Sequence, residues 1–242
     1  MTGRGSAPLS DEPRFFFMHL QKTAGTALWR RLKHQFDEAS LYPGPGDGGP
    51  PEAVLSVEHL VARWQARRND IRVVTGHFPL CTVELLDAPF TTLTLLRDPV
   101  ERTLSFLRHF RESTPEARDL SLEAIYADPV RFELVTNHMV KMLSLTVDEM
   151  DAGALTHLEF TRDRLSRAQE RLAGIDAVGF QVRFDEFCAE LGDRFGWDLG
   201  PPIFMNRTAP VPADKALRAR IAADNELDIE LYDFACTRGH RD

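Results

Sequence analysis

The segment from Phe15 to Leu28 constrains the fold of this chain more than any other. It opens with the unbroken apolar run Phe15-Phe16-Phe17-Met18, which suits a strand buried on both faces of a parallel sheet. Small and hydroxylated residues around a single lysine, Lys22, come next, and from Thr26 onward apolar residues recur at helical spacing. The segment therefore predicts a strand, a tight loop and a helix in direct succession.

This succession is typical of a phosphate-binding loop. Backbone N–H groups at the start of a helix have no partner inside it, and the helix dipole adds positive potential there. The spacing is not the G-x-x-x-x-G-K-[ST] of nucleotide triphosphatases, because Lys22 precedes Gly25. The alternative, which this segment alone leaves open, is that Gly25 only eases a turn and Lys22 is solvated.

Composition sets further limits. With 242 residues and 43% hydrophobic content, the chain predicts a disordered leader over residues 1–13 and a single domain over residues 14–242. A net charge of −8 argues against nucleic acid or an anionic membrane as the main partner. The three cysteines form no C-x-x-C pair, which argues against a disulfide framework and a zinc site. Without a membrane-spanning or signal-peptide pattern, we expect a soluble, cytoplasmic protein.

Strand and helix patterns alternate along the chain. The Pro- and Gly-rich segment 42–51 should form a surface loop or a mobile flap. Further strands are expected at 71–77, 91–96 and 175–182. Helices are expected at 57–68, 99–111, 122–126, 131–145, 162–172, 185–195 and 213–234. The alternation predicts an α/β fold, with a P-loop-like parallel sheet of four to five strands and helices on both faces.

Three polar residues follow predicted strands. Lys22 comes after the first, His77 ends the second and Arg97 leaves the third. Ligands of parallel α/β sheets bind beyond the carboxyl ends of the strands, so we expect these side chains to converge there.

Arg97 opens a second motif, Arg97-Asp98-Pro99-Val100-Glu101-Arg102-Thr103-Leu104-Ser105. Its guanidinium is a planar fork of donors that suits a phosphate, and Ser105 adds a hydroxyl about two turns into the next helix. The alternative is that Arg97 pairs with Asp98 or Glu101 and that Ser105 fills a small gap in the core.

With both motifs in view, the chain resembles the sulfotransferases that use 3′-phosphoadenosine 5′-phosphosulfate (PAPS). It looks closest to their carbohydrate branch, the heparan and uronyl 2-O-sulfotransferases and bacterial relatives. The family's 5′-phosphosulfate loop reads like H-x-P-K-T-[AG]-[GS]-T, and here it is His19-Leu20-Gln21-Lys22-Thr23-Ala24-Gly25-Thr26. Its 3′-phosphate motif, R-D-P-x-x-R-x-x-S, is matched from Arg97 to Ser105. Gln21 departs from the usual proline but removes no ligand.

The resemblance implies a role for each matched residue. Lys22 would stabilise charge on the bridging oxygen as the 5′-phosphate departs, and Arg97 with Ser105 would bind the 3′-phosphate. His77 would be the base that removes the proton of the hydroxyl to be sulfated, and Glu84 is the alternative candidate for this base. No metal is implied. The loop residues that would bind the 5′-phosphate are Lys22, Thr23, Ala24, Gly25, Thr26 and Ala27.

The acceptor is less defined. The resemblance favours a hydroxyl on a carbohydrate or a glycosylated small molecule, and another small natural product would also fit. Two other functions stay open from the sequence: a P-loop kinase or nucleotide hydrolase, and a module that binds PAPS or its product without catalysis.

Overall fold

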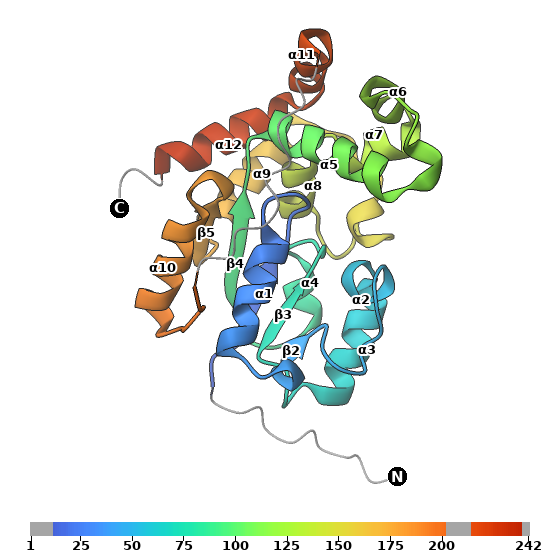
Figure 1. The fold of residues 1–242 in the computed structure, drawn as a ribbon. Coiled ribbons are helices and arrows are strands. Elements are labelled where there is room, and N and C mark those ends of the chain that lie inside the picture. The colour runs from blue at the N-terminus through green and yellow to red at the C-terminus, as the bar shows by residue number, and fades with distance from the viewer. Residues whose placement is uncertain (1–11, 202–213, 239–242) are drawn as a thin grey trace.

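The computed structural model describes residues 12–201 and 214–238. At its centre is a five-stranded, all-parallel sheet with strand order β2-β3-β1-β4-β5 (Figure 1). This confirms the predicted α/β fold. Most of the predicted leader, residues 1–11, lies outside the described residues. The strands are β1 (Phe15–Met18), β2 (Leu41–Tyr42), β3 (Val73–Gly76), β4 (Thr91–Leu96) and β5 (Ala177–Phe180).

The apolar run at the N-terminus forms the central strand. All four residues of β1 are buried, and β1 pairs with β3 on one side and β4 on the other. Met18, its last residue, lies opposite Gly76 in β3 and Thr94 in β4. The loops that leave β1, β3 and β4 therefore start at the same edge of the sheet.

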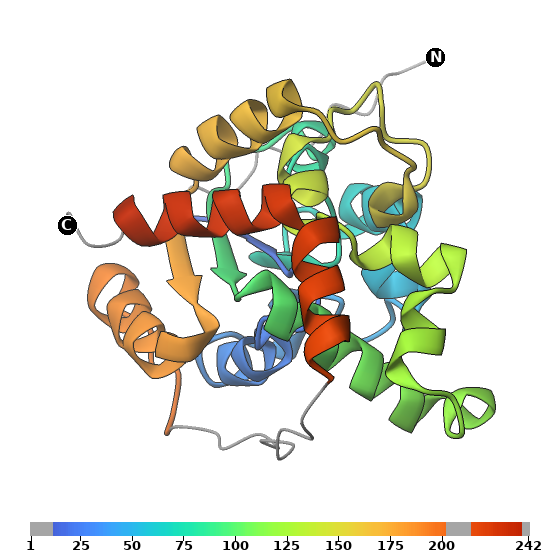
Figure 2. The same cartoon turned by 90° about the horizontal axis from the view of Figure 1, so that it is seen from above.

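Helices cover both faces, and the alternation of β1 side chains decides which cluster each residue joins. Phe15 and Phe17 pack with α1 (Gly25–Gln35) and α10 (Phe184–Phe195). Phe16 and Met18 belong to the apolar cluster on the opposite face of the sheet, and Figure 2 shows helices on both of its faces. The helices packed on that opposite face are α3 (Val57–Arg67), α8 (His138–Ser144), α9 (Arg162–Ala173) and α12 (Glu226–Arg238).

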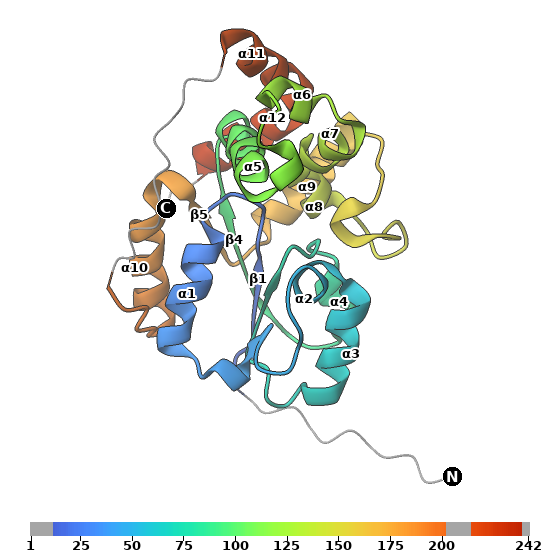
Figure 3. The ribbon, with the colours of Figure 1, turned by 45° about the vertical axis from the view of Figure 1, so that its right-hand side comes forward.

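A separate group of helices lies above the carboxyl ends of the strands (Figure 3). It has an apolar cluster of its own, which includes Leu104, Ile125 and Leu217. Its members are α5 (Pro99–Ser113), α6 (Leu122–Tyr126), α7 (Pro129–Val135) and α11 (Lys215–Asp224). The remaining short elements are the helices α2 (Glu52–Leu55) and α4 (Thr82–Leu85) and 3-10 turns at Glu38–Ser40, Pro115–Ala117, Gly153–Leu155 and Gln181–Arg183.

Two predicted long helices are each broken by an asparagine. The helix expected at 131–145 divides into α7 and α8 at Asn137, whose φ is 43°, and the helix expected at 213–234 divides into α11 and α12 at Asn225. The backbone amide of Asn137 donates to Asn225 Oδ1 at 2.9 Å, and the amide of Asp228 donates to Asn137 Oδ1 at 3.0 Å. The predictions of single helices were wrong because these hydrogen bonds between distant segments of the chain override the local periodicity.

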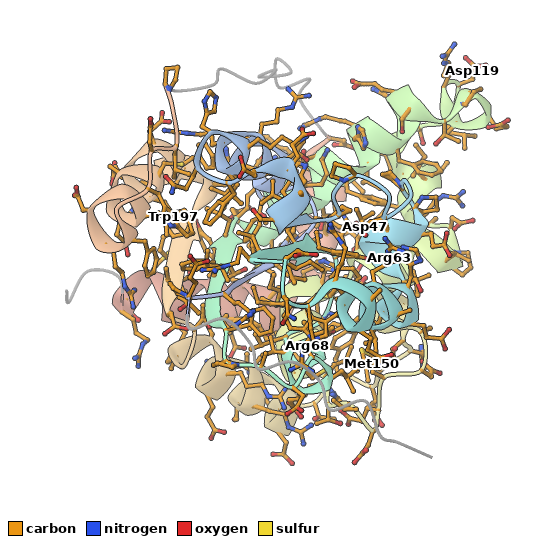
Figure 4. All side chains as sticks on the ribbon, turned by 90° about the horizontal axis from the view of Figure 1, so that it is seen from below. Asp47, Arg63, Arg68, Asp119, Met150 and Trp197 are labelled. Atoms are coloured by element: carbon orange, nitrogen blue, oxygen red, sulfur yellow. The ribbon has the colours of Figure 1, made fainter. Side chains whose placement is uncertain are left out.

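The segment 42–51 forms the surface loop that its composition predicts, but it is anchored to the domain rather than a separate flap. Its first residue, Tyr42, belongs to the edge strand β2. The carboxylate of Asp47 is fully buried, accepts from Arg63 Nε at 2.8 Å and from Arg67 Nη2 at 2.6 Å, and bonds the amide of Gly44. Figure 4 shows Asp47 beside Arg63. The loop is therefore fastened to α3 by a buried charge cluster.

Replacing Asp47 by Asn should lower the free energy of unfolding by about 1.5–3 kcal/mol, because the charge-assisted hydrogen bonds that the buried carboxylate accepts from Arg63 and Arg67 would be lost. Urea unfolding followed by circular dichroism measures the change. The exposed Asp70, replaced by Asn in the same way, is the matched control and should change stability by less than about 0.5 kcal/mol. Equal effects of the two substitutions would show that the cluster does not stabilise the loop.

Among the described residues, no helix combines the length and the apolar character that crossing a membrane requires.

Candidate functional site

The loop between β1 and α1 has an unusual backbone. Lys22 and Ala24 both adopt left-handed conformations, with φ of 65° and 75°, which few residues other than glycine adopt. The Thr23 hydroxyl donates to the carbonyl of Leu20 at 2.8 Å and fixes the turn from within. Alternating backbone conformations of this kind form concave nests of N–H groups that bind anions. Thr23 can therefore offer a ligand its backbone amide, since its hydroxyl is used by the loop itself.

Gly25 is required by close packing. A Cβ atom built at Gly25 would lie 1.9 Å from Cδ2 of His19, well inside van der Waals contact. The absence of a side chain lets the first turn of α1 approach His19, the residue that follows β1. The glycine thus brings the helix N-terminus against the edge of the sheet, where the sequence analysis expected it.

The N-terminus of α1 is open to a ligand. Its N-cap, Ala24, makes no side-chain capping bond, and its first turn has no acidic residue. Within residues 12–201 and 214–238, no acceptor bonds the backbone amides of Thr23, Gly25 or Thr26. The N-terminus of α5, in contrast, is capped by its own Asp98, whose carboxylate accepts from the amide of Glu101 at 2.9 Å. Of these two helices, α1 has the free donors that an anion needs.

Arg97 reaches this loop from the end of β4. Its Nη1 donates to the carbonyl of Lys22 at 3.0 Å, although 75 residues separate the two along the chain. Neither candidate partner from the sequence pairs with it: Asp98 caps α5, and Glu101 forms an ion pair with Arg218 at 2.6 Å. The alternative in which Arg97 makes a local carboxylate pair is therefore wrong. The guanidinium lies beside the lysine loop.

The two cations are partly desolvated. Burial lowers the pKa of Lys22, the nearby Arg97 lowers it further, and Glu112 raises it. Burial likewise lowers the pKa of Arg97. An anion bound between them would reverse both shifts, because it favours the charged form of each group. The two partly buried positive charges therefore favour the binding of a negatively charged ligand.

His77 follows β3 and contacts the same loop. Its Nδ1 lies 2.6 Å from the carbonyl oxygen of His19, and since a carbonyl only accepts, Nδ1 carries the proton. The lone pair is then on Nε2. Burial lowers the pKa of His77, the bond to His19 raises it, and Lys22 lowers it again. The imidazole is therefore neutral near pH 7, with Nε2 able to accept a proton.

The structure adds one helix face that the sequence analysis missed. Burial lowers the pKa of Lys22, Arg97 and His109, and charges between α5 and the loop add to this: Glu112 raises the pKa of Lys22, Arg108 lowers that of Arg97, and Lys22 lowers that of His109. These three residues of α5 therefore lie within electrostatic range of the loop. They lie three, four and seven positions after Ser105, which places the half-buried Ser105 on the same face. The helical spacing of these residues from Ser105 onward was the feature of the sequence that could have predicted this face.

The fallback base lies elsewhere. Glu84 is in α4, its carboxylate is exposed, and it pairs with Arg171 at 3.7 Å. His77 instead lines a cavity of about 560 Å³, within the usual range for ligand pockets, together with Thr26 and Trp29 from α1. Geometry thus favours His77 over Glu84 as the proton acceptor. In the described part of the chain, no three His, Cys, Asp or Glu side chains are grouped as metal ligands.

Buried histidines predict a loss of stability in mild acid. Burial lowers the pKa of His77 and holds those of His19 and the fully buried His138 well below the usual range. Below about pH 6.5 the unfolded chain binds protons that the folded chain does not, so the free energy of unfolding should fall by about 1.4 kcal/mol per pH unit for each such histidine. Burial raises the pKa of Asp228, so this carboxyl has the opposite effect on the pH dependence of stability. It is one group against three histidines.

Urea unfolding between about pH 7.5 and pH 5.5 tests this expectation. Replacing His138 by Gln should make the decline shallower, whereas the same replacement of the exposed His34 should leave the slope unchanged. A stability that is constant over this range would contradict the expected protonation difference.

Comparison with known proteins adds a likeness of fold. No protein-family model and no curated protein matches the chain. The fold is similar to the crystal structure of a sulfotransferase from Alicyclobacillus acidocaldarius, with a TM-score of 0.51 and 15% sequence identity, over 92% of this chain and 94% of that chain. At this identity the likeness concerns the fold.

Proposed function

We propose that this chain is a sulfotransferase that moves the sulfuryl group of PAPS to an acceptor hydroxyl. One observation carries the proposal: Lys22, Arg97 and the neutral His77 meet at one edge of the sheet, at a loop whose amides are free to bind an anion. The site thus offers two cations for an anionic donor and one proton acceptor for a hydroxyl. The fold likeness to a bacterial sulfotransferase supports the same reaction.

The 5′ end of PAPS fits the lysine loop. The open N-terminus of α1 and its unpaired amides match the needs of a phosphate and a sulfate group. The loop residues that would bind this end are Lys22, Thr23, Ala24, Gly25, Thr26 and Ala27.

The 3′-phosphate fits Arg97 and Ser105. One guanidinium nitrogen of Arg97 is held by the Lys22 carbonyl, and its buried Nε has no hydrogen-bond partner among the described residues. A buried donor without a partner costs free energy, which a phosphate oxygen would recover. Ser105, on the helix face turned toward the loop, would supply a hydroxyl.

Each residue would have one task in the reaction. PAPS, when bound, supplies a sulfuryl group on a phosphate that leaves readily. His77 Nε2 would take the proton of the acceptor hydroxyl, while the Nδ1 bond to His19 holds the ring and stabilises its cationic form. Lys22 would stabilise the charge that develops on the departing phosphate. A sulfuryl group carries less negative charge than a phosphoryl group, so we expect no need for a metal ion.

The kinase or hydrolase alternative predicts instead a nucleoside triphosphate with magnesium, and the non-catalytic alternative predicts binding without turnover. Thermal unfolding separates the first alternative from the proposal. The reaction product, adenosine 3′,5′-bisphosphate (PAP), at one hundred times its dissociation constant should stabilise the chain by about 2.7 kcal/mol, a rise of about 5–10 °C for a chain of this size.

The measurement uses PAP in EDTA, with ATP or GTP plus magnesium in parallel. AMP, which lacks the 3′-phosphate, is the matched control ligand and should give a smaller shift at equal concentration. A shift with ATP and magnesium but none with PAP would overturn the proposal in favour of a kinase or hydrolase.

A further inference from the structure

The cavity beside His77 is mostly apolar. It lies between the start of α1, the end of β3 and the loop 42–51. Prolines and an indole form much of its wall, which favours a ligand with an apolar body. The apolar side chains that line it are Trp29, Leu41, Pro43, Pro45, Pro50 and Val54.

The charges in this wall cancel. Apart from the two histidines, its ionisable side chains are Lys33 and Glu38. Their Nζ and Oε1 atoms lie 2.7 Å apart, and the ammonium also lies 5.6 Å from the centre of the Trp29 ring. The other cations of the site, Lys22 and Arg97, are those that the proposed function assigns to the phosphates of PAPS. Among the described residues that line the cavity, no unpaired lysine or arginine is left for an anionic acceptor.

The wall formed by the loop is fixed in place. Asp47 lies between the lining prolines Pro45 and Pro50, and its ion pairs with Arg63 and Arg67 join the loop to α3. Its bond to the amide of Gly44 closes the turn between Pro43 and Pro45. The cavity is therefore preformed, which limits the size and shape of the molecules that it accepts.

Building on the proposed function, we propose that the acceptor is a small, uncharged hydroxyl compound with an apolar body. The body would lie against Trp29 and the prolines, with the hydroxyl at His77 Nε2. The acceptor oxygen would bond to sulfur, the bond from sulfur to the 5′-phosphate oxygen would break, and the hydroxyl proton would pass to Nε2. This narrows the acceptor expected from the family resemblance and excludes a highly anionic polysaccharide.

The test is a pair of acceptors that differ by one charge. We expect kcat/KM for 2-naphthol, measured with radiolabelled PAPS, to exceed that for 6-hydroxy-2-naphthoate by about tenfold or more, because the carboxylate would be desolvated without a partner. An unsulfated polymer of glucuronic acid and N-acetylglucosamine should react still more slowly. Equal rates for the two naphthols, or a preference for the polymer, would overturn the proposal.

Two single substitutions locate the acceptor in this cavity. Replacing Glu38 by Gln frees the positive charge of Lys33 and should improve the naphthoate relative to 2-naphthol by about threefold, a modest change because the pair is exposed. Replacing Lys33 by Gln is the matched control and should change this ratio in the opposite direction. If neither substitution alters the ratio, the acceptor does not occupy this cavity.

A third substitution tests the aromatic wall. Replacing Trp29 by Ala should raise KM for 2-naphthol about tenfold and leave PAP affinity unchanged. If PAP does not raise the unfolding temperature of the unsubstituted chain, the proposed function itself is contradicted. The proposal for the acceptor and the proposed function are therefore contradicted by different results.

Discussion

Replacing His77 by Ala should lower the turnover number about 10²–10⁴-fold, while PAP affinity changes by less than about twofold. The reason is geometric: the bond from Nδ1 to the His19 carbonyl leaves Nε2 as the ring's proton acceptor, and His77 lines a cavity of ligand size. The measurement combines steady-state turnover from radiolabelled PAPS with PAP binding by calorimetry. Retained binding with lost turnover would also exclude the non-catalytic alternative.

The pH profile supplies a second readout for His77. Since the base acts in its neutral form and its pKa is lowered, kcat/KM should begin to fall only below about pH 6.5. Glu84→Gln is the matched control and should retain normal turnover, because Glu84 is exposed and paired with Arg171. Unchanged turnover in His77→Ala, or a large loss in Glu84→Gln, would give the role of base to the carboxylate.

Replacing Lys22 by Ala should weaken PAP binding about ten- to hundredfold, the range expected when a charge-assisted hydrogen bond to a phosphate is lost. Turnover at saturating PAPS should fall by a further factor of about 10²–10³, because Lys22 would also stabilise charge on the leaving phosphate. Calorimetry with PAP and single-turnover assays separate the two effects.

Arg97→Ala should weaken PAP binding to a similar degree by removing the ligand of the 3′-phosphate, and it should weaken AMP binding less. The exposed Lys215, replaced by Ala, is the control for a general loss of positive charge. Thermal unfolding of each variant without ligand verifies that it folds. Normal PAP affinity in both Lys22→Ala and Arg97→Ala would show that the site has been assigned to the wrong residues.

The sequence by itself was sufficient for the local parts of this molecule. The strand from Phe15, the turn around Lys22 and the helix from Gly25 are adjacent along the chain, so hydrophobic period and turn chemistry determine them. The order of strand and helix around Arg97 follows in the same way. The convergence of Lys22, His77 and Arg97 at one edge of the sheet was also predictable, because parallel strands end at a common edge.

Where two distant segments meet, the sequence was not sufficient. Periodicity runs without interruption through Asn137 and Asn225, and only the hydrogen bonds of Asn137 with Asn225 and Asp228 end the helices there. The composition of the segment 42–51 predicts a surface loop or a mobile flap, and only the burial of Asp47 against Arg63 and Arg67 fixes the loop in place.

The details of the site follow the same division. Its residue types could be read from two motifs, but the tautomer of His77 and the position of Arg97 depend on contacts with His19 and Lys22. These contacts join residues 58 and 75 positions apart. Local conformational preferences act over a few residues. Buried charges and backbone carbonyls form hydrogen bonds with distant residues only after the sheet has brought the strands together. The tertiary structure therefore decided how the site is assembled.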